Sequence, residues 1–241
     1  LQSVEELANA GIKMAEVNKL KEARIVTIGA VLSTPTKTLL AIRGFSDATV
    51  AKVRTAAAKL DKGSSGGAFT TGLEARASRQ KVIKIHTGSK QLDALLGGGI
   101  ETGSITEFFG EFRSGKTQLM HTLCVTSQLS RDSGGAEGRA VYMDTEGNFR
   151  HERIESIAGR FGLDSDETLD NIIVARAFNH EQQIDRAQEI AALCLSDGPI
   201  RLVIIDSVIA LFRVDFSGRG DLSLRQQKLG KHMSNLLQMA S

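Results

Sequence analysis

The stretch Gly110-Glu111-Phe112-Arg113-Ser114-Gly115-Lys116-Thr117 fits the pattern G-x-x-x-x-G-K-[ST] in full. This pattern is typical of a loop whose backbone amides cradle phosphates at the N-terminus of a helix. The apolar residues 105–109 in front of it predict a strand, and we expect a helix from Lys116 onward. A glycine-rich turn could match the pattern by chance, but a strand and a helix on its two sides favour the phosphate loop.

The glycines and polar residues of this loop have expected roles in nucleotide binding. Gly110 and Gly115 let the backbone wrap around phosphates. Lys116 would reach the β- and γ-phosphates, and the Thr117 hydroxyl would bind Mg²⁺. The stretch therefore predicts a site for a nucleoside triphosphate with Mg²⁺.

From about residue 81, short apolar runs alternate with helical patterns. We predict strands at residues 140–143, 172–174 and 202–205, and helices at residues 151–161, from about 179 and from about 222 onward. The run 202–205 is continuously apolar, which is typical of a strand covered on both faces. Strands that alternate with helices predict an α/β fold with a mainly parallel sheet between helices.

Two carboxylates follow predicted strands. Asp206 ends the run 202–205, which suits a second ligand for Mg²⁺, although many such residues only cap a helix. Glu146 follows the strand 140–143, so it should lie at the carboxyl edge of the sheet, where it could orient a water molecule for hydrolysis. The alternative for Glu146 is a residue that simply starts a helix.

Residues 1–62 form a separate segment with helical patterns and no predicted strand. It holds ten Lys and Arg against six Asp and Glu, whereas the remaining 179 residues hold twenty against twenty-two. A basic segment suggests an anionic partner, but an ordinary solvated helical surface explains the charge as well. Capping patterns predict helices from Ser3 and from Ser46, with further helices near residues 14–23 and 36–42. The Gly- and Ser-rich residues 62–67 predict a flexible linker and a domain boundary.

Two places suit contacts with nucleic acid. A helix-hairpin-helix is plausible around Arg43 and Gly44, because the glycine permits a tight turn and the amides of the next helix can take a phosphate. The alternative is a small helical bundle used for protein contact. The second segment is a glycine-rich loop with three arginines spaced six residues apart around it, Arg213, Arg219 and Arg225. This arrangement suits phosphate contacts, although an ordinary solvated loop fits equally well.

Composition excludes several classes of protein. With 41% hydrophobic and 24% charged residues, the chain can bury a core, so wholesale disorder is excluded. No apolar run is long enough for a membrane span, and the first residues do not resemble a signal peptide. Two cysteines, Cys124 and Cys194, and five dispersed His residues argue against a disulfide framework or a structural zinc site and fit a reducing compartment. A start at Leu1 instead of Met suggests a fragment.

Several longer segments together resemble one family. They are residues 96–101 (Leu-Gly-Gly-Gly-Ile-Glu), the phosphate loop continued to Gln118, residues 144–150 (Asp-Thr-Glu-Gly-Asn-Phe-Arg) and residues 175–178 (Ala-Arg-Ala-Phe). Over essentially its whole length the chain resembles the eukaryotic RecA-type DNA strand-exchange recombinases. Segments 210–221 and 225–229 are most similar to the meiosis-specific branch of that family.

The resemblance implies a RecA-like ATPase core over residues 81–241, a helix-hairpin-helix duplex-binding domain over residues 1–62, and a linker with an oligomerisation segment over residues 63–80. It implies ATP held by residues 110–118, with Arg153 against the adenine. Lys116 and Glu146 would be catalytic, and Thr117 and Asp206 would hold Mg²⁺. The DNA-contacting residues would be Arg213, Arg219 and Arg225 in the first DNA-binding loop, and Arg43 and Gly44 in the N-terminal domain.

The implied function is assembly of a helical filament or ring on single-stranded DNA, followed by pairing with a homologous double-stranded DNA and strand exchange. This activity would serve meiotic recombination and double-strand break repair in the nucleus, with recombination mediator proteins as partners and no membrane contact. Two rival interpretations remain. One is a non-enzymatic relative that binds a recombinase and regulates its filaments, and the other is a DNA tether on a nucleotide-sensing domain that never exchanges strands.

The sequence departs from the family pattern in two places. The family joins protomers through an F-x-x-A segment, but Phe69-Thr70-Thr71-Gly72 has Gly in place of Ala, which predicts weaker filament contacts. The chain also stops at Ser241, where family members continue into further sheet and a second DNA-binding loop. The resemblance therefore implies a C-terminally truncated chain with an incomplete sheet, in which two strand edges lack a partner.

Overall fold

The computed structural model describes residues 2–61, 71–196, 198–218 and 220–240. The chain divides into two compact units. The first consists of the residues up to Gln80 together with Ala191–Ser196, and the second of Lys81–Ile190 together with the described residues from 198 to 240. The Gly- and Ser-rich residues 62–67, predicted as a flexible linker, lie outside the described residues.

The first unit is helical, as predicted. Its helices are α1 (Glu6–Asn9), α2 (Met14–Glu22), α3 (Ile28–Ser33), α4 (Thr36–Leu40), α5 (Asp47–Leu60) and α6 (Gly72–Arg79). Fully buried side chains such as Leu7, Leu20 and Val53 form its core. Ser46 caps α5 as predicted, because its Oγ accepts a hydrogen bond from the backbone N–H of Thr49.

The start of the first helix differs from the prediction. Helix α1 begins at Glu6 and not at a capping box on Ser3. Ser3 instead forms an isolated antiparallel bridge with Thr27, and its Oγ accepts a hydrogen bond from the N–H of Glu5. Pairing with a distant segment holds Ser3 in an extended conformation, so the helix starts after it.

The second unit alternates strands with helices. Its strands are β1 (Lys84–Ile85), β2 (Ile100–Glu101), β3 (Arg139–Asp144), β4 (Ile172–Arg176) and β5 (Ile200–Asp206). Its helices are α7 (Lys90–Leu95), α8 (Lys116–Thr126), a 3-10 turn at Arg131–Ser133, α9 (His151–Phe161), α10 (Ser165–Asp170), α11 (His180–Ser196), α12 (Ala210–Asp215) and α13 (Leu222–Ala240). The helix predicted at residues 151–161 is confirmed at both ends.

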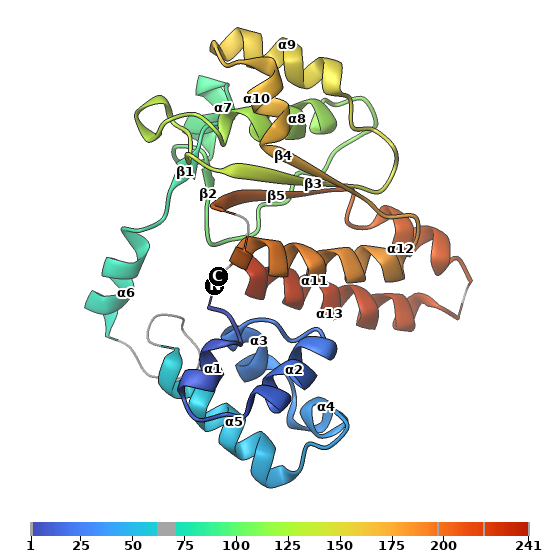
Figure 1. The fold of residues 1–241 in the computed structure, drawn as a ribbon. Coiled ribbons are helices and arrows are strands. Elements are labelled where there is room, and N and C mark those ends of the chain that lie inside the picture. Colours follow the sequence, from blue (N-terminus) through green and yellow to red (C-terminus); the bar gives the residue numbers. More distant parts are fainter. Residues whose placement is uncertain (1, 62–70, 197, 219, 241) are drawn as a thin grey trace. The chain divides into compact units, whose positions relative to one another are not determined.

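The strands form a parallel sheet in the order β4-β3-β5 and a separate antiparallel pair, β1 with β2. Helices α8, α9 and α10 cover one face of the parallel sheet, and α11 and α13 cover the other (Figure 1). This arrangement confirms the predicted α/β class, with a parallel sheet between helices and a helical N-terminal region. Within the described residues, no helix has both the length and the apolar character needed to cross a membrane.

One strand prediction is wrong. Residues 105–109, in front of the phosphate loop, form no strand, and Ile105 and Phe109 are 41% and 89% exposed. A strand exists only through pairing, and no described segment pairs with these residues. The run 202–205 forms a strand as predicted, within β5, in a sheet that helices cover on both faces (Figure 1). Because β5 lies at an edge of the described sheet, it is less deeply buried than the central β3.

Candidate functional site

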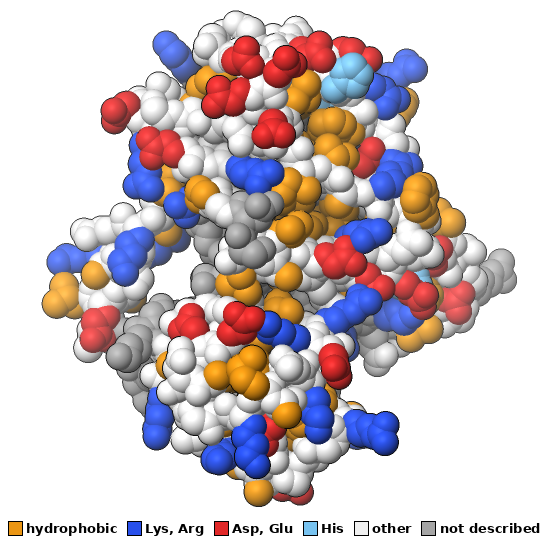
Figure 2. Space-filling model, in the orientation of Figure 1, with side chains coloured by type: hydrophobic (Ala, Val, Ile, Leu, Met, Phe, Trp, Pro, Cys, Tyr) orange, Lys and Arg blue, Asp and Glu red, His pale blue; other side chains and the backbone are white. Residues whose placement is uncertain are grey.

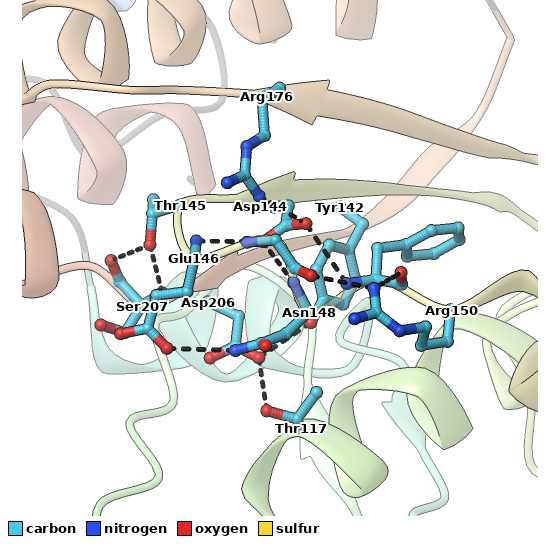
Figure 3. A network of polar contacts seen from close by, with 12 residues as sticks. Thr117, Tyr142, Asp144, Thr145, Glu146, Asn148, Arg150, Arg176, Asp206 and Ser207 are labelled. Atoms are coloured by element: carbon cyan, nitrogen blue, oxygen red, sulfur yellow. Dashed lines mark hydrogen bonds and ion pairs between the residues drawn. The ribbon is translucent and has the colours of Figure 1, made fainter.

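The three parallel strands end side by side at one edge of the sheet. In the register of the sheet, Asp144 at the end of β3 lies opposite Arg176 of β4 on one side and Asp206 of β5 on the other. Open α/β sheets bind ligands at the carboxyl ends of their strands. Figure 3 shows Thr117 and Glu146 gathered with these residues at this edge.

Thr117, in the first turn of α8, is bonded to the end of β5. Its Oγ1 donates a hydrogen bond to Asp206 Oδ2 at 2.8 Å, and the hydroxyl of Tyr142 donates to the same oxygen at 2.8 Å. Tyr142 is fully buried in β3, and burial together with the charge of Asp206 raises the pKa of its hydroxyl well above the usual range. Tyr142 therefore remains a donor, and two hydroxyl groups orient the Asp206 carboxylate.

The phosphate loop turns sharply at Gly115, whose φ of +90° favours glycine. Arg113 also has a positive φ, of 64°. Lys116 is directed back into the loop, where its Nζ donates to the carbonyl oxygens of Gly110 at 2.8 Å and Glu111 at 2.6 Å. The loop thus carries positive charge on its inner side, beside the N-terminus of α8.

Asp144 organises the segment that carries Glu146. Its carboxylate accepts hydrogen bonds from the backbone N–H groups of all four residues from Glu146 to Phe149, at 2.7–3.2 Å, and pairs with Arg176 at 2.9 Å. Burial raises the pKa of this carboxyl, but the four N–H donors outweigh burial and bring it below its ordinary value. The exposed Glu146 accepts a hydrogen bond on Oε2 from the Asn148 amide at 3.1 Å. Its carboxylate is therefore oriented and open to water.

A buried histidine joins α8 to the same segment. His121 Nδ1 lies 2.7 Å from the carbonyl oxygen of Thr117, and His121 Nε2 lies 3.1 Å from the backbone nitrogen of Arg150. Because a carbonyl only accepts and an N–H only donates, the ring is neutral with its proton on Nδ1. Burial lowers the pKa of His121, in agreement with a neutral ring.

The residues at this edge fit a nucleotide with a divalent cation. Thr117 and Asp206 present a hydroxyl and a carboxylate oxygen 2.8 Å apart, and Mg²⁺ prefers such oxygen ligands. Helix α8 is eleven residues long, and its N-terminal N–H groups and Lys116 face the loop that precedes it. A loop with inward positive charge next to an oxygen pair is what a phosphate chain with Mg²⁺ needs.

Four residues that build this edge were given no role in the predictions from sequence, namely Tyr142, His121, Arg176 and Asn148. Tyr142 is the one tyrosine of the chain and stands in an otherwise apolar strand, which signals that its hydroxyl needs a buried partner. The other three act through contacts that depend on tertiary structure, and no local pattern indicates them.

Comparison with known proteins identifies the family. The Rad51 family model matches residues 78–241, more than half of the chain. The chain belongs to the Rad51 family. This membership confirms the resemblance to RecA-type recombinases found in the sequence.

Three relatives illustrate the similarity. The chain is 51% identical over 238 residues to the meiotic recombination protein DLH1 of Candida albicans, an alignment that covers 99% of this chain and 72% of DLH1. It is 50% identical over 239 residues to the meiotic recombination protein DMC1 homolog of Glycine max, covering 99% of this chain and 68% of the relative. It is 49% identical over 237 residues to the DNA repair protein RAD51 homolog 1 of Arabidopsis thaliana, covering 98% and 68%.

In this Rad51-family chain, the other residues predicted for the nucleotide site have exposed side chains. They are Glu111, Phe112, Arg113, Ser114, Gln118 and Arg153. The Arg113 guanidinium lies over the Phe112 ring, 5.4 Å from its centroid. Arg153 is on the first turn of α9, and its positive charge adds to burial in lowering the pKa of His121.

The arginines predicted for the first DNA-binding loop of this Rad51-family chain flank that loop on two helices. Arg213 is exposed on α12, and Arg225 is half-buried on α13. Arg219 lies outside the described residues. The structure therefore brings Arg213 and Arg225 into the same unit as the phosphate loop.

The residues predicted for duplex contact lie in the other unit. Arg43 is exposed, and Gly44 has a φ of +85° in the turn between α4 and α5. Both line an open concavity of about 580 Å³ together with Lys19. Figure 2 shows Lys and Arg side chains spread over the visible face of this unit and not collected in one patch.

The oligomerisation segment predicted from the F-x-x-A pattern of the Rad51 family is described only in part. Phe69 lies outside the described residues. Gly72 is the first residue of α6, and a capping box between Thr71 and Glu74 precedes it. Residues 72–79 of the predicted linker are therefore helical.

Proposed function

We propose that this chain is an ATP-dependent DNA recombinase, which assembles on single-stranded DNA and promotes homologous pairing and strand exchange in meiotic recombination and double-strand break repair. One geometric relationship carries the proposal: the Thr117–Asp206 oxygen pair and the Glu146 segment lie at one sheet edge beside the phosphate loop. Membership in the Rad51 family supports it, because relatives at about 50% identity are named for meiotic recombination and DNA repair.

The phosphate loop would bind ATP. Lys116, which donates to two loop carbonyls, would transfer these hydrogen bonds to phosphate oxygens, which are stronger acceptors because they are charged. Residues 111–114 and Gln118 would surround the phosphates, and Arg153 would pack on the adenine. Mg²⁺, when bound, would neutralise phosphate charge, with Thr117 and Asp206 as its protein ligands.

Glu146 would be the catalytic base. Its exposed carboxylate, oriented by the Asn148 amide, would accept a proton from the attacking water. Because Asp144 binds the backbone of residues 146–149, the position of Glu146 is fixed relative to β3. Lys116 would stabilise the negative charge that develops on the transferred phosphoryl group.

DNA would be held mainly by its backbone. Arg213, Arg219 and Arg225 would contact single-stranded DNA, and Arg43 and Gly44 would contact the duplex. The chain has no Trp and one Tyr, so it offers little surface for base stacking. Binding should therefore weaken strongly as salt is raised.

ATP would act mainly as an assembly switch, because bound nucleotide would favour the DNA-binding filament or ring and hydrolysis would release it. Phe69 and Gly72 would join neighbouring protomers. Recombination mediator proteins would be partners, and the nucleus would be the site of action.

ATP turnover by the purified chain, with and without single-stranded DNA, tests the proposal. We expect turnover stimulated by DNA and lost in Glu146→Gln, while nucleotide binding is retained. Glu181→Gln changes an exposed carboxylate on α11 and should behave as the unmodified chain. A strand-exchange assay between single-stranded DNA and a homologous duplex then tests the full activity. Turnover that Glu146→Gln leaves unchanged would contradict the assignment.

A regulatory relative that binds a recombinase without hydrolysing ATP is the second candidate. Gly72 favours it, because the family contact has Ala at this position and the glycine should weaken self-assembly. Nucleotide and recombinase binding without turnover would support this candidate. DNA and ATP binding without strand exchange would instead indicate a DNA tether on a nucleotide-sensing domain.

A further inference from the structure

One histidine contacts both helices that flank the predicted DNA-binding loop. Helix α12 ends at Asp215, and α13 begins at Leu222. His180, the first residue of α11, lies between the two helices and forms polar contacts with each. Neither the phosphate loop nor the Glu146 segment uses these contacts.

On the α12 side, the Asp215 carboxylate binds the N-terminus of α11. Asp215 Oδ2 lies 2.8 Å from the backbone nitrogen of His180 and 2.6 Å from its Nδ1. A helix N-terminus has unpaired N–H groups and favours negative charge. The backbone N–H of His180 lowers the pKa of Asp215 below its ordinary value, so the carboxylate is ionised.

On the α13 side, Lys228 completes the chain of contacts. Lys228 Nζ lies 3.0 Å from His180 Nε2. An ammonium group only donates and a carboxylate only accepts, so the ring is neutral, with Nδ1 donating to Asp215 and Nε2 accepting from Lys228. One imidazole thus bridges a negative charge on α12 and a positive charge on α13.

An aromatic side chain packs against this bridge. The His180 ring packs on Phe216 with centroids 4.7 Å apart, and Lys228 Nζ lies 5.1 Å from the centroid of the same ring. The His180 side chain is only 10% exposed. Hydrogen bonds shielded from water hold geometry more firmly than exposed ones. We call His180, Asp215, Phe216 and Lys228 the His180 clasp.

We propose that the His180 clasp fixes α12 and α13 relative to each other, so that Arg213 and Arg225 bind one stretch of phosphate backbone together. Arg213 lies two residues from Asp215, and Arg225 lies three residues from Lys228, so each arginine is within one turn of the clasp. His180 is a positioning residue and does not touch DNA. The inference rests on the proposed DNA contacts of Arg213 and Arg225.

The physical reason is effective concentration. When two arginines are held at a fixed separation, the first phosphate contact makes the second one intramolecular. Without the clasp, Phe212 of α12 still packs on His232 of α13, but the helix ends near the arginines are held less firmly, so the second contact loses part of this advantage. His180 should therefore affect DNA affinity and leave ATP affinity unchanged.

The first test needs no DNA. Spin labels are attached to cysteines at the exposed positions Val214 and Leu224, after Cys124 and Cys194 are replaced by Ala. The distribution of distances between the labels should broaden in His180→Ala. It should stay unchanged in Glu181→Ala, which removes an exposed side chain from the same helical turn. An unchanged distribution in His180→Ala would overturn the proposal.

The second test measures affinity for a labelled single-stranded oligonucleotide by fluorescence anisotropy. His180→Ala should weaken binding about tenfold, with affinity for an ATP analogue within about twofold of the unmodified chain. Arg213→Ala should weaken binding in the unmodified chain and much less in the His180→Ala background. Additive losses would overturn the proposal, because independent contacts add.

Two further variants, Arg213→Ala and Arg225→Ala, distinguish a wrong DNA site from a wrong role of the His180 clasp. If Arg213→Ala and Arg225→Ala both leave DNA binding unchanged, the proposed DNA site is wrong, and this inference is wrong with it. The spin-label distances then still report whether the clasp holds the helices. If His180→Ala does not fold, His180→Asn replaces it, because its shorter amide donates to Asp215 but does not reach Lys228, and we expect a smaller loss of DNA affinity.

Discussion

Thr117 Oγ1 donates a hydrogen bond to Asp206 Oδ2 at 2.8 Å, across 89 residues of sequence. This contact joins the first turn of α8 to the end of β5, so it fixes the phosphate-loop helix against the sheet. Both atoms are oxygens of the kind that Mg²⁺ prefers. The pair that connects α8 to β5 is therefore also the pair suited to the cation.

Thr117→Ala should weaken nucleotide binding in the presence of Mg²⁺ and leave binding without Mg²⁺ nearly unchanged. The variant removes one proposed ligand oxygen and keeps the loop backbone. We expect affinity for an ATP analogue in Mg²⁺ to fall at least about tenfold. Affinity in EDTA should stay close to that of the unmodified chain. Isothermal titration with and without Mg²⁺ measures both values, and an equal loss in the two buffers would contradict the ligand role.

Tyr142→Phe is the matched control, because it removes the other hydroxyl bonded to Asp206 Oδ2. Tyr142 is buried away from the loop surface, so its role is to support the carboxylate. Its loss should lower the free energy of unfolding by about 1 kcal/mol and leave the Mg²⁺ dependence of binding in place. A loss of Mg²⁺ dependence as large as in Thr117→Ala would show that both hydroxyls act only by orienting Asp206.

Lys116→Ala should abolish nucleotide binding. The ammonium group is the positive charge that the loop encloses, held by the carbonyls of Gly110 and Glu111. Its removal leaves those carbonyl oxygens facing the phosphates with no cation between them, so repulsion adds to the lost attraction. A binding titration with ATP and Mg²⁺ measures the effect. Full affinity in the variant would refute the site.

Much of the second unit could be predicted because its signals are local. Helix α9 was predictable to the residue, since Ile154, Ile157 and Ala158 recur at helical spacing and are buried, and Gly162 ends the helix with a φ of +71°. Residues 105–109 have strand-like composition, but pairing with another segment decides whether a strand forms, and composition does not encode it.

In the candidate site, too, some residues were predictable from local sequence, whereas the contacts that orient them depend on tertiary structure. Thr117, Lys116 and Asp206 were predictable because phosphate chemistry demands their residue types at a fixed spacing or strand end. The contacts that orient them were not. Tyr142 reaches Asp206 across 64 residues and His121 reaches Arg150 across 29, and only the register of the sheet and the packing of α8 bring these residues together.

His232 should make the fold sensitive to acid. Burial in α13 lowers its pKa from 6.5 to about 4, so the folded state excludes a proton that the unfolded state binds below pH 6.5. The free energy of unfolding should therefore fall as the pH drops from 6.5 through 4, and it should be unaffected by this group above 6.5. His232→Met should remove this dependence, which amounts to about 2 kcal/mol at pH 5. Chemical denaturation at pH 7.5 and pH 5 measures the difference.

His151 supplies a control, because its pKa is shifted in the direction opposite to that of His232. It is exposed, and its hydrogen bond to Glu155 raises its pKa. A raised pKa gives stability that is present below the unfolded value and lost as the pH rises, so His151→Gln should not improve stability at pH 5. If His232→Met and His151→Gln shift the pH dependence in the same direction, burial of His232 is not the cause.

Gly72→Ala should strengthen self-assembly. Among the described residues, a Cβ added at Gly72 meets no atom within 4 Å apart from its chain neighbours and the backbone of its own helix. Gly72 stands at the first position of α6, where alanine is well tolerated. The methyl group would add about 0.8 kcal/mol on burial in a neighbouring protomer, and the loss of glycine freedom would add roughly 0.5–1 kcal/mol. Together these lower the assembly concentration about tenfold, as light scattering would measure. Gly72→Ser restricts the backbone in the same way but would bring a polar hydroxyl into the contact with the neighbouring protomer. A larger gain with Ala than with Ser indicates burial of the methyl group in that contact, equal gains assign the effect to α6 alone, and no gain with either removes Gly72 from the interface.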